Sequence, residues 1–281
     1  MISVLITAYN AEPYIREAIG SVLSQTEKDI ECVVVDDGST DGTLRAARSL
    51  EDPRLRVIEG GRIGRGRALN LALAESRGEY VAILDADDLS HPRRLEIERR
   101  ALEAAPGFAV VGTGQILTGE GEAPDWPEAG GEDGPLPLRE VSRDLVFINP
   151  LSHPTLLLRR AALEKVGGYD EARKDLFDWD LLIRLAAEGF GLGKLPVPLG
   201  AKRIHPGQFF EGRRQLSYMV HCLQVQGQAV RALGRSPLLW ITFPFIFLYR
   251  MLPRGLRMPA RRGVGAVLRG AARPGAGREG G

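Results

Sequence analysis

Short apolar runs alternate with segments of helical spacing along the first third of the chain. The runs are rich in Val and Ile and occupy residues 2–6, 32–35, 55–58 and 80–84. Residues 14–23, between the first two runs, carry apolar side chains at helical spacing. Runs that are apolar on both faces are typical of strands in a parallel sheet that crossover helices cover on both sides. The pattern therefore predicts an α/β fold, and in such folds ligands bind beyond the carboxyl ends of the strands.

The second half of the chain shows a different pattern. Residues 118–137 are rich in Gly, Pro and acidic residues, which predicts a long surface loop or a hairpin insertion. An apolar strand at residues 155–158, a helix at about residues 176–188 and a turn at His205 follow. We expect these elements to complete the same domain.

Composition narrows the class of protein. With 281 residues, of which 44% are hydrophobic, the chain can bury one large core. The two cysteines, Cys32 and Cys222, fall in a predicted strand and a predicted helix, so neither a disulfide framework nor a cysteine metal site is indicated. Residues 1–7 already read as a core strand with no leader pattern before them, so we expect a protein on the cytoplasmic side, in a reducing compartment.

Carboxylates gather at the end of the fourth apolar run, in Asp85-Ala86-Asp87-Asp88. Side chains two residues apart on an extended segment face the same way, so Asp85 and Asp87 can direct two carboxylates at one point. Oxygen ligands of this kind suit Mg²⁺ or Mn²⁺ held together with phosphate oxygens. The alternative is a solvated acidic turn in which one Asp caps the helix near Pro92.

A second acidic pair, Asp36-Asp37, ends the second run and leads into Gly38-Ser39-Thr40-Asp41. Adjacent residues of a strand point to opposite faces, so one of the pair can face a ligand while the other anchors the loop. The alternative is a tight turn, and for Asp41 we expect the turn role, as a cap of the next helix.

These segments together resemble a known family. Residues 3–10 (SVLITAYN), 35–41 (VDDGSTD) and 84–88 (LDADD) look like the nucleotide-sugar half of the family 2 glycosyltransferases, which act with inversion. Residues 149–155 and 166–170 extend the likeness into the acceptor half, so it covers about residues 1–210. The resemblance implies a GT-A type fold, in which helices flank a mostly parallel nucleotide-binding sheet and a helical extension follows.

The resemblance also implies a division of the chain and a set of functional residues. By the resemblance, residues 1–115 would bind the nucleotide sugar and residues 116–210 would supply the acceptor site and the base. Beyond the resemblance, composition predicts a helical extension at residues 211–252, which can associate with a membrane, and a basic, disordered tail at residues 253–281. Asp87 would be the main metal ligand, with Asp85 contacting ribose or metal. The residues expected at the donor are Thr7, Ala8, Tyr9, Asp37, Arg65, Asp85 and Ala86.

Arg65 and Tyr9 each keep a second interpretation. Arg65 lies where a helix begins and can present its guanidinium to a diphosphate, or it can simply be a solvated residue of the helix start. Tyr9 offers an aromatic face for stacking on the base, or it can be a packed aromatic at the rim.

Asp178 is the candidate catalytic base. It shares a helix face with Leu181, Leu182 and Leu185, and a carboxylate at the end of an apolar stripe is partly desolvated and therefore more basic. Asp180, four residues before Arg184, fits a surface ion pair instead. The family usually carries Glu just before this Asp, where Phe177 stands here; the alternative for Asp178 is an acid that caps the helix.

Two histidines are further candidates. His205 matches a turn that in relatives often returns a His toward the metal or the diphosphate, and imidazole suits Mn²⁺ better than Mg²⁺. The alternative is a simple turn residue before Pro206. His153 fits either the lining of the acceptor pocket or a buried structural imidazole.

Together these residues and the resemblance predict an inverting, metal-dependent glycosyltransferase. It would move a sugar from a nucleoside-diphosphate sugar, a UDP-sugar first among them, to a hydroxyl of a glycan or lipid-linked acceptor in cell-surface polysaccharide synthesis. A non-catalytic sugar-nucleotide or polysaccharide-binding protein and a nucleotidyltransferase are the alternatives, although the Lys-bearing, Gly-rich triphosphate loop of the latter is missing.

The C-terminal segment raises the question of a membrane. Residues 238–249 form an uncharged run of about twelve residues, short of the roughly 20 needed to span a bilayer. Trp240 and Tyr249, with the seven Arg of residues 253–281, suit a helix that lies on an anionic inner membrane face. The alternative is a helix packed on the body or on a second copy in a homodimer. Nucleic acid is not expected as a partner, because only the tail is basic.

Overall fold

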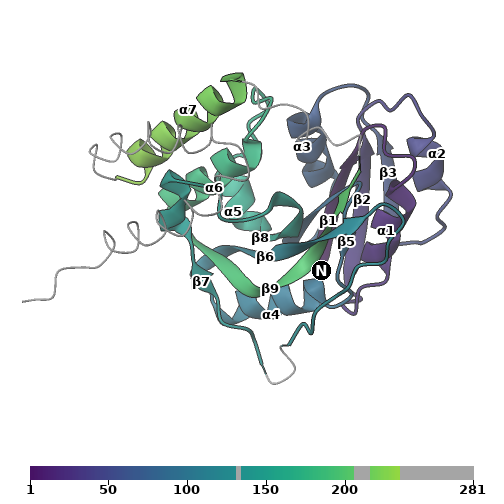
Figure 1. Cartoon of the computed structure of the whole chain (residues 1–281), viewed down its shortest axis with the longest axis horizontal. Coiled ribbons are helices and arrows are strands. Elements are labelled where there is room, and N and C mark those ends of the chain that lie inside the picture. Colours follow the sequence, from purple (N-terminus) through teal and green to yellow (C-terminus); the bar gives the residue numbers. More distant parts are fainter. Residues whose placement is uncertain (131–133, 206–215, 235–281) are drawn as a thin grey trace, which may run out of the picture. The chain divides into compact units, whose positions relative to one another are not determined.

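The computed structural model describes residues 1–130, 134–205 and 216–234 (Figure 1). The strands are β1 (Ile2–Ala8), β2 (Ile30–Asp36), β3 (Leu55–Glu59), β4 (Tyr80–Asp85), β5 (Leu89–Ser90), β6 (Phe108–Gly119), β7 (Arg139–Glu140), β8 (Leu156–Arg159) and β9 (Gly191–Ile204). The α-helices are α1 (Ile15–Leu23), α2 (Thr43–Arg48), α3 (Arg65–Glu75), α4 (Arg94–Ala104), α5 (Arg160–Lys165), α6 (Phe177–Ala187) and α7 (Leu216–Ala232). Two 3₁₀ turns, η1 (Ser142–Val146) and η2 (His153–Thr155), precede β8.

The strands form one mixed sheet in the order β3-β2-β1-β4-β8-β6-β9-β5, and β7 pairs with β9. The first four strands are parallel, as their apolar runs predicted. Strand β8 is antiparallel to both β4 and β6, whereas β6 and β9 run parallel to each other. Thr7 of β1 lies opposite Val35 of β2 on one side and Asp85 of β4 on the other. The carboxyl ends of β1, β2 and β4 therefore meet at one edge.

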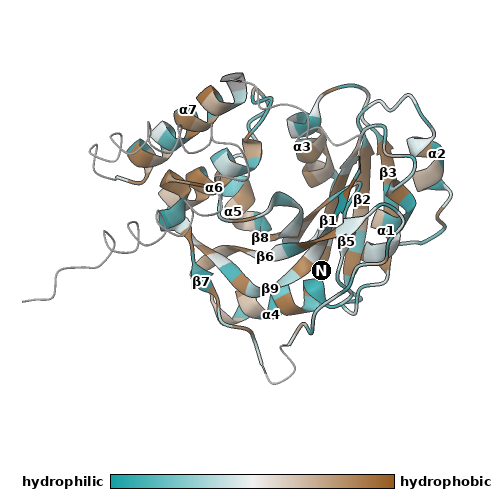
Figure 2. Ribbon diagram, viewed as in Figure 1, coloured by the Kyte–Doolittle hydropathy of each residue, from teal (hydrophilic) through white to brown (hydrophobic). Residues whose placement is uncertain are grey.

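The parallel half owes its stability to burial on both faces of the sheet. Strand β2 is buried along its whole length, and Figure 2 shows the strands of this half coloured mainly as hydrophobic. Helix α1 packs its apolar stripe on the sheet through Ile15, Ala18, Ile19 and Val22. Burying each large aliphatic side chain is worth roughly 1.5–3 kcal/mol, so this layer fixes the positions of the strand ends.

The second half follows the predicted outline. Residues 120–130 and 134–138 contain no helix or strand, which agrees with the predicted loop. The apolar run at residues 155–158 is β8, and the predicted helix is α6. Among the residues that the structure describes, no helix combines the length and apolar character needed to cross a bilayer. Residues 238–249 and the basic tail lie outside the described residues.

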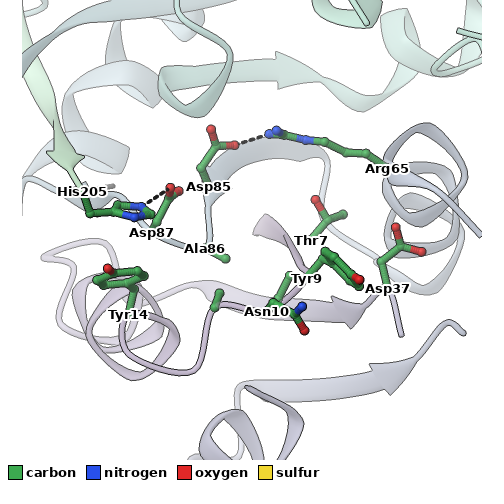
Figure 3. A pocket seen from close by; sticks show the side chains of 12 residues that line it. Thr7, Tyr9, Asn10, Tyr14, Asp37, Arg65, Asp85, Ala86, Asp87 and His205 are labelled. Atoms are coloured by element: carbon green, nitrogen blue, oxygen red, sulfur yellow. Dashed lines mark hydrogen bonds and ion pairs between the residues drawn. The ribbon is translucent and has the colours of Figure 1, made fainter. Parts of the chain in front are cut away.

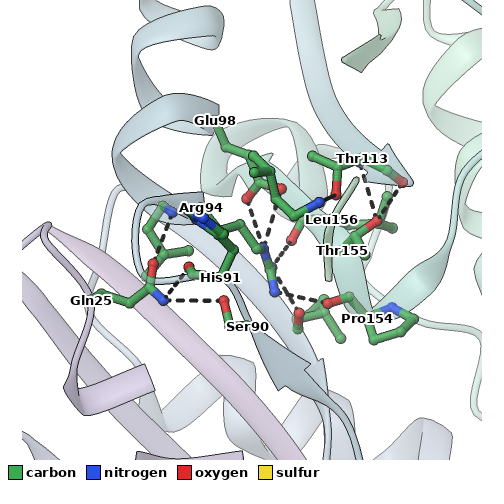
Figure 4. A network of polar contacts seen from close by, with 12 residues as sticks. Gln25, Ser90, His91, Arg94, Glu98, Thr113, Pro154, Thr155 and Leu156 are labelled. Carbon is green, nitrogen blue, oxygen red and sulfur yellow. Dashed lines mark hydrogen bonds and ion pairs between the residues drawn. The ribbon is translucent and has the colours of Figure 1, made fainter. Parts of the chain in front are cut away.

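One buried ion pair ties the two halves together (Figure 4). Arg94 and Glu98 of α4 have 1% and 0% of their surface exposed. The Nε of Arg94 donates to both carboxylate oxygens of Glu98, at 3.2 and 3.1 Å. Its Nη1 donates to the carbonyl of Pro154 in η2 and its Nη2 to that of Ile83 in β4, both at 2.9 Å. One guanidinium thus joins β4, two residues before Asp85, to the turn that carries His153.

Candidate active site

A pocket of about 270 Å³ opens at the shared edge of β1, β2 and β4 (Figure 3). It contains all seven residues expected at the donor, together with both other metal candidates, Asp87 and His205. Three further residues of the lining, Asn10, Ala11 and Tyr14, were not predicted from the sequence. The full lining is Thr7, Ala8, Tyr9, Asn10, Ala11, Tyr14, Asp37, Arg65, Asp85, Ala86, Asp87 and His205.

The acidic pair at the end of β2 divides its roles, as the alternation of side chains along a strand requires. Asp37 lines the pocket, and its Oδ1 accepts hydrogen bonds from the backbone N–H groups of Ile63 at 2.8 Å and Gly64 at 2.9 Å. Asp36 is buried, and its Oδ2 accepts from the N–H of Ser39 at 3.1 Å. Asp37 therefore faces the pocket and anchors the loop after β3, whereas Asp36 shapes the turn.

That turn depends on a glycine. Gly38 has φ of +74°, and a Cβ there would lie 2.9 Å from the backbone nitrogen of Arg62. A side chain at this position would push the two loops apart. Asp41 lies in the turn before α2, where it accepts from the N–H groups of Thr43 at 3.0 Å and Glu12 at 3.2 Å. The prediction that it caps this helix is wrong, because Gly42 occupies the N-cap position and α2 has no side-chain cap.

Tyr9 stands at the rim with 42% of its surface exposed. The guanidinium of Arg62, from the loop after β3, donates to the hydroxyl of Tyr9, and its Cζ lies 4.6 Å from the ring centre. Arg62 carried no signal in the sequence, because nothing there shows that its loop folds back onto β1. The ring is held from one side and remains accessible to a planar ligand.

The carboxylates at the end of β4 enter two separate pairs (Figure 3). Asp85 accepts a hydrogen bond from the guanidinium of Arg65, and the Oδ2 of Asp87 lies 3.1 Å from the Nε2 of His205. Within the described part of the chain, no three His, Cys, Asp or Glu side chains are gathered as a ready metal site. None of the Asp residues caps α4, whose first turn has no side-chain cap.

The third carboxylate, Asp88, is a structural anchor. It is 3% exposed and accepts from the Nε2 of Gln115 at 3.0 Å and from the backbone N–H of Arg203 at 3.2 Å. Burial, followed by repulsion from Asp85 and Asp87, raises the pKa of Asp88 to about 8. Because Arg203 lies two residues before His205, this anchor brings the end of β9 to the acidic end of β4.

Tyr14 supports His205 from below in the view of Figure 3. The two ring centres are 4.4 Å apart with an angle of 36° between the planes. The hydroxyl of Tyr14 donates to the Oε1 of Glu120 at 2.8 Å, and the Cζ of Arg203 lies 5.2 Å from its ring centre. Burial and the hydrogen bond to Glu120 raise the pKa of Tyr14, so the phenol stays neutral.

Arg65 lies between the acidic end of β4 and the start of α6. Besides its bond to Asp85, its Cζ lies 5.2 Å from the centre of the Phe177 ring. Burial alone would lower the pKa of Arg65, but the carboxylates of Asp85, Asp178 and Asp87 outweigh burial and raise it. The guanidinium is therefore a fixed positive charge between the metal candidates and the candidate base.

Asp178 is the second residue of α6, which begins after Leu176 in a left-handed conformation with φ of +53°. Its side chain is half-buried and accepts a hydrogen bond from the Nδ2 of Asn149 at 2.7 Å. Burial raises the pKa of Asp178. Hydrogen bonds from the N–H groups of Trp179 and of Asp178 itself, and the charge of Arg65, lower it by less, so the pKa stays raised. Asp178 is near the pocket without lining it.

The structure also places His153 and Asp180, two residues near the candidate base. His153 is 7% exposed, its Nε2 lies 2.9 Å from the hydroxyl of Tyr169, and burial lowers its pKa to about 3, so it is a neutral buried imidazole. The prediction of a surface ion pair for Asp180 is wrong. The pair with Arg184 forms at 2.8 Å, but Asp180 is only 2% exposed because Gln228 of α7 covers it, donating at 2.8 Å.

Comparisons with known proteins identify the family of this chain. The family model described as glycosyl transferase family 2 matches residues 3–167. A protein of Bacillus subtilis (strain 168) named "Putative glycosyltransferase EpsE" is 33% identical over 255 residues, which cover 87% of this chain and 88% of that protein.

Two solved structures share the fold. S. aureus TarS 1-349 in complex with UDP-GlcNAc has a TM-score of 0.65 and 22% identity, over 89% of this chain and 72% of that one. The mannosyltransferase PcManGT from Pyrobaculum calidifontis, in complex with GDP-Man and Mn²⁺, has a TM-score of 0.62 and 23% identity, over 97% and 76% of the chains. The predicted GT-A type fold is thereby confirmed, and the chain belongs to glycosyl transferase family 2.

Proposed function

We propose that this glycosyltransferase is an inverting enzyme that moves a sugar from a nucleoside-diphosphate sugar to a hydroxyl group of a glycan or lipid-linked acceptor. One observation carries the proposal. The carboxylates at the end of β4 share a pocket with Tyr9 and Asp37, and a basic carboxylate, Asp178, stands beyond Arg65 on α6. The proposed donor site and the proposed proton acceptor thus lie on either side of the Arg65 guanidinium.

The donor would lie along the ends of the three parallel strands. The accessible ring of Tyr9 suits stacking on a base, and Asp37 lies beside it with a carboxylate fixed by two backbone N–H groups. TarS binds UDP-GlcNAc and PcManGT binds GDP-Man, so two proteins that share this fold bind nucleoside-diphosphate sugars. A UDP-sugar is our first candidate here.

A divalent cation would be held by Asp87 and His205, with Asp85 as a further ligand or as a contact of the ribose. The fit rests on the donor set: one carboxylate oxygen and one imidazole nitrogen already lie 3.1 Å apart, and this combination suits Mn²⁺ better than Mg²⁺. When bound, such a cation stabilises the negative charge of the departing nucleoside diphosphate. The permanent charge of Arg65 supports the same task from the protein side.

Asp178 would accept the proton of the acceptor hydroxyl. Its raised pKa makes it a better base than an exposed aspartate, yet the neighbouring Arg65 and backbone N–H groups keep the ionised form accessible. The deprotonated oxygen then displaces the nucleoside diphosphate in one step, and a single displacement inverts the anomeric centre.

In the cell, we propose a role in the synthesis of a surface polysaccharide, on the cytoplasmic side and peripheral to the inner membrane face. The support for a membrane surface, and for the alternative of a homodimer, is the apolar run at residues 238–249 with the basic tail behind it. Deleting residues 237–281 and fractionating cells tests this. Unchanged membrane association of the truncated chain would end the anchoring proposal.

A panel of UDP- and GDP-sugars with Mn²⁺, followed by assay of nucleoside diphosphate release, tests the activity. Asp178→Asn should lower that release by roughly 10²- to 10⁴-fold while UDP binding in the presence of Mn²⁺ is kept. Full activity of the variant would remove Asp178 from the mechanism. Pyrophosphate release would indicate a nucleotidyltransferase, and binding without turnover in the wild type would indicate a binding protein.

A further inference from the structure

The segment Leu145–Leu151, which we name the support segment, runs from η1 to η2 past the start of α6. Three of its backbone carbonyls accept hydrogen bonds from side chains on three other elements. Trp179 Nε1 of α6 donates to Leu145 at 2.9 Å, Gln226 Nε2 of α7 to Phe147 at 2.7 Å, and Lys194 Nζ of β9 to Pro150 at 2.9 Å. The support segment is therefore fixed from several sides, although it has no regular structure between its two turns.

Asn149 lies in the middle of this segment with its amide group held at both ends. Its Oδ1 accepts from the backbone N–H of Leu151 at 3.2 Å, and its Nδ2 donates to the Oδ2 of Asp178 at 2.7 Å. A backbone N–H can only donate and an ionised carboxylate can only accept, so both contacts require the same orientation of the amide. The NH₂ group is thus directed at the candidate base.

We propose that Asn149 is a positioning residue for this glycosyltransferase, which holds the carboxylate of Asp178 by one oxygen so that the group meets the acceptor hydroxyl in a fixed orientation. The inference rests on the proposed function, in which Asp178 is the base. It adds a residue 29 positions before Asp178, which is not among the described residues that line the donor pocket.

The chemistry of the amide suits this task. Charged and titratable groups that act on Asp178, among the described residues, include Arg65 of α3, Asp85 of β4 and the phenol of Tyr169 before α6. A donor hydrogen bond favours the ionised carboxylate and so opposes the effect of burial. A second cation in place of Asn149 would lower the basicity of Asp178 further, whereas a neutral amide orients the carboxylate and leaves it basic.

Two substitutions test the proposal, with UDP release from a UDP-sugar in Mn²⁺ as the assay. Asn149→Ala removes the contact, and Asn149→Asp keeps the shape but replaces the donor by a second carboxylate. We expect kcat to fall by about 10- to 100-fold in both variants, since a hydrogen bond to a charged group is lost. The acid limb of the pH profile should move up by about one pH unit, and further in Asn149→Asp. The Kd of UDP with Mn²⁺ should stay within about twofold.

Asn70→Ala is the matched control. Asn70 also joins two segments through both ends of its amide, which bind the backbone N–H and carbonyl groups of Tyr169 and the carboxylate of Glu171. Its hydrogen bonds within the described part of the chain do not include one to Asp178. The control should keep the wild-type pH profile. If both Asn149 variants keep wild-type kcat, or lose activity with no movement of the acid limb, the positioning role is overturned.

Asp178→Asn separates this inference from the proposed function. If Asp178→Asn is inactive while both Asn149 variants behave as wild type, only the role of Asn149 is refuted. If Asp178→Asn is fully active, the base assignment and the positioning role are refuted together. Loss of activity in all three, with the shifted acid limb in the Asn149 variants, supports both.

Discussion

Replacing Arg94 by Met tests how strongly the buried ion pair of α4 holds the two halves of the fold together. Met keeps the length and apolar character of the side chain but removes every donor of the guanidinium. Glu98, which is 0% exposed, would lose its partner, and the carbonyls of Pro154 and Ile83 would each lose a donor. The substitution therefore leaves a buried carboxyl without its partner and removes the Arg94 donor from three carbonyls, because Leu156 also accepts from this guanidinium, at 3.4 Å.

The expected cost can be worked from these contacts. Removing one partner of a buried ion pair destabilises a protein by about 3–5 kcal/mol. For a folded unit of this size, about 1 kcal/mol corresponds to roughly 2–4 °C in Tm, so Tm should fall by roughly 6–20 °C. The double variant Arg94→Met/Glu98→Leu removes both charges and should regain at least about 2 kcal/mol of that loss.

The loss should depend on pH in a defined direction. Burial raises the pKa of Glu98 to about 7 even though Arg94 opposes the shift. A carboxyl with a raised pKa in the folded state contributes stability that is present below its unfolded value of about 4.3 and is lost as pH rises through 7. Without Arg94 the pKa of Glu98 rises further, so the penalty of Arg94→Met should be larger at about pH 8 than at about pH 5.5.

Urea unfolding followed by tryptophan fluorescence measures the free-energy penalty at both pH values, and thermal unfolding measures the change in Tm. Arg100→Met on the same helix is the control, because its contact with Glu96 at 3.5 Å is a partly exposed pair worth about 1 kcal/mol or less. A penalty for Arg94→Met no larger than that of Arg100→Met would refute the reasoning. A penalty that is equal at the two pH values would refute the assigned role of Glu98.

Two predictions concern the pocket. His205→Ala should raise the Mn²⁺ concentration needed for half-maximal UDP release by at least about tenfold, because one candidate ligand is lost. An unchanged Mn²⁺ requirement would show that His205 only supports the turn. Tyr9→Ala should weaken UDP binding, measured by calorimetry, by about 1–3 kcal/mol. Tyr9→Phe should keep the stacking face and therefore the binding. Equal losses of binding in both variants would show that the hydroxyl contact with Arg62 matters instead.

The sequence by itself determined the parallel half of the fold and the edge at which the site lies. Val- and Ile-rich runs indicate burial on both faces, and parallel strands place their carboxyl ends together, so Asp37 and Asp85 could be assigned to one edge of the sheet. Thr7 was assigned to the same pocket by the resemblance to the family. The helix that bears Asp178 could also be predicted from the sequence, because helical spacing of apolar residues is a local property.

The contacts between these elements were decided only by the tertiary structure. His205 meets Asp87 across 118 residues because β9 enters the sheet beside β6 and is anchored on Asp88. Asp180 looked like half of a surface pair because Arg184 lies four residues on, but α7 covers it. Asn149 carried no sign of its contact with Asp178. Periodicity reports which faces are buried, whereas the partner of a polar side chain depends on how distant segments pack.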